Sequence, residues 1–159
     1  MSRLPSLGRR GEGWFLLQVV LLAGIGAAGL WLGPDWTGTT RLLTVVVGGS
    51  LLIGGLLLVG LGARRHDTLV SPLPRPVEGA RLVDDGVYGR VRHPIYSGVM
   101  ASAIGWSLAT ASLVALGLSV ALVVLLDLKA RREEVWLAGH YPAYADYAAR
   151  TRRFMPGLY

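Results

Sequence analysis

Two long apolar runs constrain the fold of this chain more than any other feature. Residues 14–32 contain one polar side chain, Gln18, and residues 42–62 contain no charged side chain. Each run is about as long as the stretch of roughly 20 residues that a helix needs to cross the hydrocarbon core of a bilayer. A secretory signal peptide is an alternative for the first run, but the second run follows after a short turn. We therefore interpret both as membrane-spanning helices of the mature protein.

A third apolar region, residues 96–128, is too long for one span and barely long enough for two. The only plausible turn within it is Ala-Thr-Ala-Ser at residues 109–112. We expect two helices here, and the second continues into charged sequence until Gly139 and Pro142 end it. The predicted spans are residues 14–32, 42–62, 94–109 and 112–128, followed by a short helix at 143–151.

The composition agrees with a membrane protein. Hydrophobic residues make up 52% of the 159 residues and charged residues only 16%, which is too apolar for an ordinary soluble domain. The chain has no Cys, which excludes a disulfide, a thiol nucleophile and a Cys-ligated metal. Lys129 is the only Lys among 16 Lys and Arg residues, which hints at a GC-rich bacterial genome. We predict a single all-α integral membrane domain, residues 1–159, in a bacterial inner membrane.

The positions of the basic residues predict the orientation of the spans. Of the 16 Lys and Arg residues, only Arg41 lies in the connection after the first span, and none lies in the turn at residues 109–112. Because cytosolic connections are enriched in Lys and Arg, we expect both termini and the connection at residues 63–92 in the cytosol. That arrangement needs an even number of spans, which agrees with four. The expected partner is the lipid bilayer, with no nucleic acid, and the oligomeric state stays open.

The connection at residues 63–92 is predicted to have a functional role. Structureless connections of about 30 residues are uncommon in compact proteins unless they are functional. Pro72, Pro74 and Pro76 favour an extended path. Residues 82–86 are interpreted as a short strand-like piece that ends in a turn.

Residues 86–98 combine glycines, aromatics, arginines and a histidine between two apolar halves of the chain. Pro94 forces His93 toward an extended backbone and suits the first position of a helix. A helix that begins at Pro94 would place Arg92 and His93 at its N-terminal end, where free N–H groups and the helix dipole attract anions. The alternative is that these basic residues only meet lipid head groups.

Two adjacent acidic residues lie on the expected cytosolic extension of the last long helix. Glu134 shares a helix face with small and apolar residues, whereas Glu133 can pair with Lys129 four residues earlier. We therefore favour Glu134 as the ligand-binding acid. The alternative is that both carboxylates neutralise neighbouring arginines. Asp127, near the membrane boundary, either has a functional role or pairs with Arg131.

The motifs of the C-terminal half occur in a specific order. They are Gly86-x-Tyr88-x-x-x-Arg92-His93-Pro94-x-Tyr96-x-Gly98, Glu133-Glu134-x-x-Leu137, Tyr144-x-x-Tyr147 and Arg153-x-x-Pro156. From residue 82 onward the chain thereby resembles the isoprenylcysteine carboxyl methyltransferase and phospholipid methyltransferase superfamily. One departure is Tyr141-Pro142, which stands where members usually carry an aromatic-glycine pair.

This resemblance implies an integral membrane enzyme that uses S-adenosylmethionine, releases S-adenosylhomocysteine and binds the cofactor on the cytosolic side. Its cytosolic catalytic elements would be residues 81–98 and 129–156, with catalytic roles for Arg92 and Glu134. The implied cofactor-binding residues are Tyr88, His93, Pro94, Tyr96, Gly98, Glu133, Glu134, Leu137 and Tyr144. By their chemistry, His93 and Arg92 suit the carboxylate of the cofactor, and Glu134 suits its amino group or ribose hydroxyl groups.

The implied reaction is methyl transfer to a lipophilic or small acceptor, on a carboxylate, an amine or a thiol. An amine or thiol must lose a proton, for which Glu133, Glu134 or a Tyr could act as the base. The alternative is a non-catalytic membrane scaffold whose basic cytosolic face binds lipids. A nicotinamide-dependent reductase, as in the distantly similar sterol reductases, needs many more spans. His66, His93 and His140 lie on separate segments, so no metal or haem site is expected.

Overall fold

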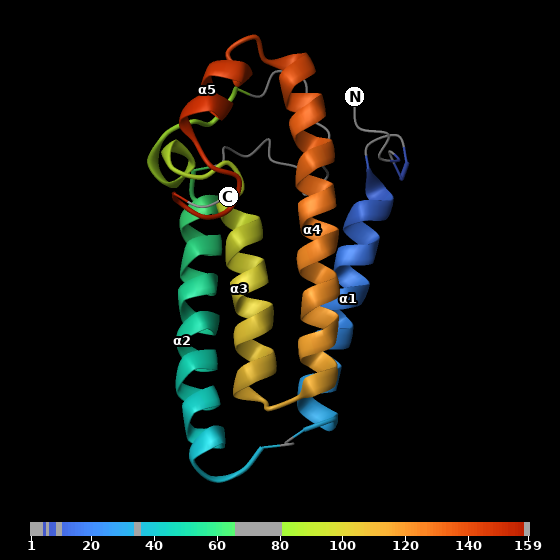
Figure 1. Cartoon of the computed structure of the whole chain (residues 1–159). Helices are drawn as coiled ribbons and strands as arrows, with labels where there is room; N and C mark the ends of the chain where they lie inside the picture. Colours follow the sequence, from blue (N-terminus) through green and yellow to red (C-terminus); the bar gives the residue numbers. More distant parts are fainter. Residues whose placement is uncertain (1–4, 6, 9–10, 34–35, 66–80, 158–159) are drawn as a thin grey trace.

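The computed structural model describes residues 5, 7–8, 11–33, 36–65 and 81–157. These residues form five α-helices and one short 3-10 helix (Figure 1). In chain order the elements are α1 (Glu12–Trp31), α2 (Gly38–Ala63), η1 (Gly86–Gly89), α3 (Pro94–Ala109), α4 (Leu113–His140) and α5 (Tyr144–Arg150). The predicted all-α class is confirmed, and each predicted helix is present with ends shifted by a few residues. The predictions for His66 and for the prolines at residues 72–76 lie outside the described residues.

The strand-like piece predicted at residues 82–86 is not found. Residues 81–85 form neither helix nor strand, and the chain turns into η1 at Gly86, where φ is 57°. A strand must pair its backbone groups with a neighbour. Within the described residues the isolated β-bridge pairs Val91 with Arg152 instead, so residues 82–86 have no ladder to join.

Local sequence signals set the starts of the two central helices. Pro94 occupies the first turn of α3, where its missing N–H breaks no hydrogen bond. Ser112 caps α4, because its side-chain oxygen accepts a hydrogen bond from the Ala115 N–H at 3.2 Å. The Ser112 hydroxyl also donates to the Ala28 carbonyl of α1 at 3.2 Å. The cap therefore fixes both the start of α4 and its contact with α1.

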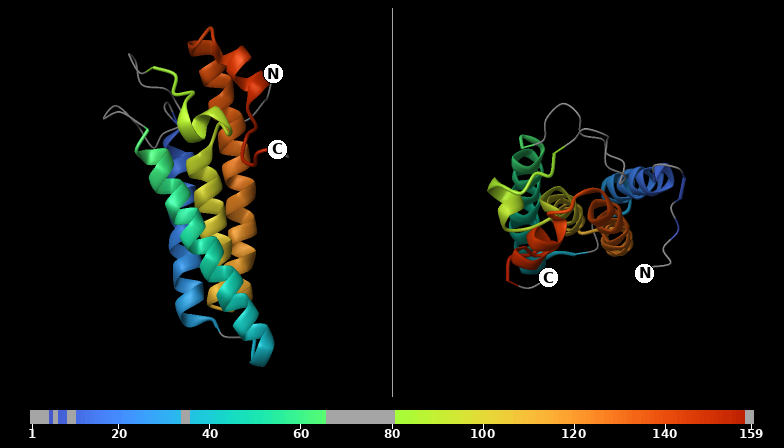
Figure 2. Two further views of the ribbon diagram at one scale, coloured as in Figure 1. Left: turned by 90° about the vertical axis from the view of Figure 1, so that its left-hand side faces the viewer. Right: turned by 90° about the horizontal axis from the view of Figure 1, so that it is seen from above.

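The four longest helices run alternately in opposite directions and form an elongated bundle (Figures 1 and 2). Helices α3 and α4 lie at its centre, with α2 packed on α3 and α1 packed on α4. The start of α3, the end of α4, η1 and α5 all lie at one end of the bundle (Figure 1). The alternation therefore brings polar segments that are far apart in the sequence to the same place.

Glycines let the backbones of α2 and α3 touch. Gly48 and Gly55 of α2 face Gly105 and Gly98 of α3. A Cβ atom at Gly55 would lie 2.5 Å from the Gly98 carbonyl oxygen, and one at Gly98 would lie 2.6 Å from the Gly55 carbonyl oxygen. Such close approach through small residues is typical of helix pairs in membranes. Any larger side chain at these positions would separate the two helices.

Three helices, α1, α2 and α4, are long and apolar enough to cross a membrane. Their apolar side chains point mostly outward, and in the apolar window of α2 only 11% of the residues are buried. An exposed apolar surface of this extent suits lipid rather than water. The exposed apolar side chains therefore indicate an integral membrane protein. Helix α3 has 16 residues, slightly fewer than the roughly 17 of the shortest transmembrane helices. The fourth span therefore stays a prediction.

The hydrophobic core lies between α1, α3 and α4 and extends to the C-terminal segment. Its described members are Ile25, Ala28, Met100, Ala103, Ala115, Leu122, Leu126, Ala130 and Phe154. Phe154 follows α5, so its side chain anchors the segment after that helix in the bundle. Buried apolar surface of this kind stabilises the position of a segment that has no regular secondary structure.

Candidate functional site

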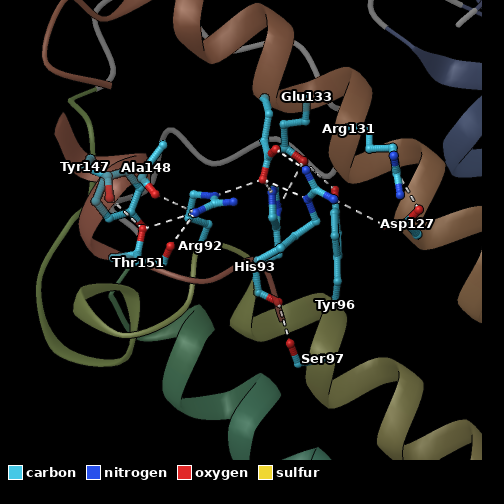
Figure 3. Close-up of polar contacts among 12 residues, drawn as sticks. Arg92, His93, Tyr96, Ser97, Asp127, Arg131, Glu133, Tyr147, Ala148 and Thr151 are labelled. Atoms are coloured by element: carbon cyan, nitrogen blue, oxygen red, sulfur yellow. Dashed lines mark hydrogen bonds and ion pairs between the residues drawn. The ribbon is translucent and has the colours of Figure 1, made fainter. Parts of the chain in front are cut away.

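Five ionisable side chains meet at the polar end of the bundle, and we call them the polar cluster. Arg92 and His93 precede α3, Glu133 and Glu134 lie near the end of α4, and Arg153 lies on the tail, defined here as residues 151–157. Figure 3 shows His93 and Tyr96 pointing toward Glu133. The segments are remote in the sequence, and the alternating helix directions bring them together.

The tail is held against the start of α3 by main-chain hydrogen bonds. Val91 and Arg152 form a parallel bridge. The Arg92 N–H donates to the Arg152 carbonyl at 2.7 Å, and the His93 N–H donates to the Arg153 carbonyl at 3.1 Å. The tail, distant in the sequence, thus holds the two residues that precede α3. The anion site predicted from free N–H groups in the first turn of α3 stays a prediction.

The Arg92 guanidinium links α3 to α4 and α5. Its Nε donates to Glu134 Oε1 at 2.9 Å, and its Nη1 donates to the Ala148 and Thr151 carbonyls at 3.0 and 2.6 Å. The last carbonyls of a helix have no partner within it, so Arg92 satisfies groups at the end of α5. Figure 3 shows these contacts converging on Arg92. This geometry gives Arg92 a structural role, and its catalytic role stays a proposal.

Glu134 lies at the centre of the polar cluster. Its carboxylate accepts hydrogen bonds from Arg92 Nε at 2.9 Å and from Arg153 Nη2 and Nε at 2.8 and 3.1 Å, and it lies 3.3 Å from His93 Nε2. Burial alone would raise the pKa of this carboxyl. The hydrogen bonds from His93, Arg153 and Arg92 outweigh burial and hold its pKa well below the usual range. Glu134 is therefore ionised at neutral pH and neutralises two arginines.

Glu133 has different neighbours. Its Oε2 accepts a hydrogen bond from the Tyr96 hydroxyl at 2.8 Å and lies 3.8 Å from His93 Nδ1. The Tyr96 and His93 rings are stacked, with centroids 5.2 Å apart and planes inclined by 5°. The Glu133 side chain is 24% exposed, against 15% for Glu134. Glu133 is thus the more accessible of the two acids and is held by a tyrosine.

Tyrosines from η1 and α5 are buried beside the polar cluster. Tyr147 donates its hydroxyl to the Tyr88 carbonyl at 2.9 Å. The buried Tyr144 hydroxyl has no hydrogen-bond partner within the described part of the chain. Burial and the nearby Glu134 carboxylate raise the pKa of this hydroxyl, so it stays protonated and able to donate. Because buried polar groups are nearly always paired, the Tyr144 hydroxyl marks a position where a ligand could bind.

Three predicted site residues shape the helices beside the polar cluster. Pro94 is buried in the first turn of α3. Gly98 faces α2, where an added Cβ would lie 2.7 Å from Val59 Cγ2. The Leu137 carbonyl accepts the Tyr141 N–H at 2.8 Å and so ends α4. Cofactor contacts of these three residues stay proposals.

Arg153 belongs to the motif Arg153-x-x-Pro156 but is not among the predicted catalytic or cofactor-binding residues. Besides binding Glu134, Arg153 places Nη1 3.5 Å from Asp127 Oδ1. The predicted pair of Asp127 with Arg131 is confirmed at 2.7 Å. Within the described ranges, no three His, Asp or Glu side chains are grouped to hold a metal ion.

Residues 43–144 match the family model for phospholipid methyltransferases. This match covers more than half of the 159 residues. The chain belongs to the phospholipid methyltransferase family. The resemblance drawn from the motifs is thereby confirmed at the level of the family. The matched region contains every member of the polar cluster except Arg153.

The chain is also similar to the cobalt-zinc-cadmium resistance protein CzcN of Cupriavidus metallidurans. The two are 30% identical over 148 residues, which is 91% of this chain and 60% of the relative. The chain therefore spans about three fifths of the length of that protein. The alignment is long enough to include α1 or the tail in addition to the region of the family model, so the likeness extends beyond residues 43–144.

Proposed function

We propose that this chain transfers a methyl group from S-adenosylmethionine to a lipophilic or small acceptor at the cytosolic face of a membrane. Family membership supports the reaction class. The observation that carries the proposal is the polar cluster: two adjacent carboxylates and a histidine, beside a buried hydroxyl that lacks a partner among the described residues, at one end of an apolar bundle. The four-span topology with both termini in the cytosol is part of this proposal.

The residues of the site fit the cofactor by their chemistry. The cofactor carries an ammonium group, a carboxylate and ribose hydroxyl groups. Glu133 would accept hydrogen bonds from the ammonium group or a ribose hydroxyl, because it is ionisable and partly exposed. The unpaired Tyr144 hydroxyl would donate to an oxygen of the ligand. His93 lies between the two acids and would be the donor for the carboxylate.

When bound, the cofactor supplies a methyl group on a positively charged sulfur. The residues of the chain provide the fixed surroundings for it. Glu134 keeps Arg92 and Arg153 in place, so the tail and α5 stay attached to the start of α3. Fixed geometry of the reacting groups is the main source of acceleration that such a site can offer.

An amine or thiol acceptor must lose a proton, and we assign Glu133 to accept it. Among the described contacts, Glu133 has no arginine partner, whereas Glu134 has two. Burial raises the pKa of the Tyr88 and Tyr144 hydroxyls, so these tyrosines stay neutral and act as donors. A carboxylate acceptor needs no base.

Binding and methyl transfer test the proposal together. The full chain in detergent is titrated with S-adenosylmethionine and S-adenosylhomocysteine by calorimetry, and labelled methyl transfer is screened over amine lipids, fatty acids, thiols and prenylcysteine analogues. We expect binding of both molecules and labelling of one acceptor class. If neither molecule binds at millimolar concentration, the proposed methyltransferase activity is wrong. Binding of anionic vesicles alone, through exposed side chains such as Arg65, Arg90 and Arg152, would favour the non-catalytic scaffold.

A further inference from the structure

Lys129 is a buried charged residue at the membrane side of the polar cluster. Only 1% of its surface is exposed, and it lies four residues before Glu133 on α4. Its Nζ donates a hydrogen bond of 2.7 Å to Gln18 Oε1 of α1. It also lies 5.0 Å from the centroid of the Tyr96 ring of α3 and 6.0 Å from that of the Phe15 ring. Three helices therefore meet at this one ammonium group.

Burial of an ammonium group is costly and requires specific partners. The side-chain oxygen of Gln18 and the face of an aromatic ring are both such partners, because an oxygen lone pair and the negative face of a ring attract a cation. Gln18 is the one polar side chain of residues 14–32. The apolar helix α1 thus places its polar group at the site where Lys129 needs it.

Tyr96 connects this buried group to the polar cluster. Its ring contacts Lys129 and stacks on His93, and its hydroxyl donates to Glu133 Oε2 at 2.8 Å. An aromatic ring is rigid, so fixing the ring also fixes the direction of the hydroxyl group. The contacts run in sequence from Gln18 through Lys129 and Tyr96 to the more accessible acid.

We propose that Gln18 and Lys129 are positioning residues for the methyltransferase site. They hold the Tyr96 ring so that its hydroxyl stays hydrogen-bonded to Glu133. Helix α1 is then part of the functional site, although the match to the family model begins only at residue 43. This inference rests on the proposed function, because it concerns the acid assigned to the cofactor and to the acceptor proton.

Calorimetric affinity for S-adenosylhomocysteine is the first measurement, made on the full chain in detergent. Lys129→Met keeps a long apolar side chain but removes the cation, and we expect affinity to fall by about tenfold, as for loss of one hydrogen bond to an ionised group. Lys129→Arg keeps a cation against the ring and should restore most of the affinity. Gln18→Leu removes only the hydrogen-bond acceptor on α1 and should also lower the affinity. The inference is therefore testable even if Lys129→Met does not fold.

Ser119→Ala is the matched control. Ser119 lies on the same helix, is fully buried and forms a 2.9 Å hydrogen bond with Ser107 of α3, away from the polar cluster. Its replacement also removes one buried hydrogen bond between helices. We expect unchanged affinity. A loss equal to that of Lys129→Met would show a general packing effect and overturn the proposal.

The Tyr96 environment gives a second readout that needs no ligand. The protein is labelled with 3-fluorotyrosine, and the Tyr96 ¹⁹F resonance is assigned with Tyr96→Phe. Lys129→Met and Gln18→Leu should shift this resonance, and Ser119→Ala should leave it in place. An unmoved resonance in Lys129→Met overturns the proposal. If the unaltered chain binds no S-adenosylhomocysteine, the proposed function fails; if it binds and Lys129→Met binds equally well, only this inference fails.

Discussion

At the residue scale, Glu133 and Glu134 show that neighbouring side chains of the same type can have different roles because their contacts differ. Helical position favoured Glu134 as the ligand-binding acid. In the structure its carboxylate is engaged by Arg92, Arg153 and His93, whereas Glu133 is held by one tyrosine hydroxyl. A carboxylate whose lone pairs are already used holds the site together, and one with free lone pairs is better able to bind a ligand. Replacing Glu134 should therefore mainly affect stability, and replacing Glu133 should mainly affect ligand binding.

Glu134→Gln should destabilise the fold at neutral pH. It removes the carboxylate that Arg92 and Arg153 share, and breaking a buried pair in this way costs roughly 3–5 kcal/mol. The pKa of Glu134 is lower in the folded chain than in the unfolded chain. Its stabilisation is thus complete above the unfolded-state pKa of about 4.3 and is lost as pH falls toward the folded-state pKa.

Thermal unfolding in detergent at neutral pH and at about pH 3.5, below the ordinary pKa of Glu, measures this effect. The unaltered chain should lose more stability on acidification than Glu134→Gln. A pH dependence that is equal in both proteins would show that Glu134 does not carry the paired charge.

His93→Ala should weaken binding of S-adenosylhomocysteine, because His93 lies between the two acids and is only 6% exposed. Loss of a charge-assisted contact costs about 1.5–3 kcal/mol, or roughly ten- to a hundredfold in affinity. His140→Ala is the control, since His140 is exposed and its ring packs in a T-shaped pair with the Tyr141 ring. Calorimetry that finds equal losses for the two variants would remove His93 from the binding site.

At the scale of elements, the tail has no regular secondary structure of its own and is held by its contacts. Its main chain pairs with the segment before α3, Arg153 binds Glu134, and Phe154 lies in the core. The tail therefore completes the polar cluster from outside the matched family region. Its attachment should depend on a small number of side chains.

Arg153→Gln should loosen the tail and expose the N–H groups of Arg92 and His93, which donate to tail carbonyls. We expect faster amide hydrogen exchange in a peptide that contains these two residues, because exchange follows local opening. Arg150→Gln removes a guanidinium that pairs with Asp84 on the exposed surface and should leave the exchange unchanged. Identical exchange in the two variants would show that Arg153 does not hold the tail.

At the scale of the whole molecule, the contact between α2 and α3 depends on residues without side chains. A Cβ at Gly55 would lie 2.5 Å from the Gly98 carbonyl oxygen, whereas a Cβ at Gly54 meets nothing within 4 Å. Gly55→Ala should therefore destabilise the bundle by about 1–3 kcal/mol, the usual cost of overpacking. Gly54→Ala should be neutral or slightly stabilising. Melting temperatures in detergent that fall equally would contradict the close helix contact.

The orientation in the membrane can be tested with single cysteines, because the chain has no Cys. Thr39→Cys at the start of α2 and Gly139→Cys near the end of α4 are at exposed positions. With both termini in the cytosol, a membrane-impermeant thiol reagent should label Thr39→Cys in intact cells and Gly139→Cys only after permeabilisation. The opposite pattern would invert the proposed topology, and labelling of both would exclude an even number of spans.

The helices could be predicted from the sequence because the signals that create them are local. Uncharged apolar runs of membrane-spanning length, Pro94 at a helix start and Ser112 before α4 act over one segment each. The sequence also indicated that Arg92, His93, Tyr96, Glu133 and Glu134 gather, because the predicted topology puts their segments on the same side of the membrane. Alternating helix directions then explain why these segments share one end.

Only the tertiary structure decided which partner each polar group has. Helical spacing puts Glu133 and Glu134 on adjacent faces, but the rotation of α4 against α3 and the path of the tail determine that Arg153 reaches Glu134. The hydrogen bond between Lys129 and Gln18 could not be predicted either, because 111 residues separate the two in the sequence. Such contacts depend on how complete helices pack, and packing is settled by the summed burial of many side chains rather than by any local pattern.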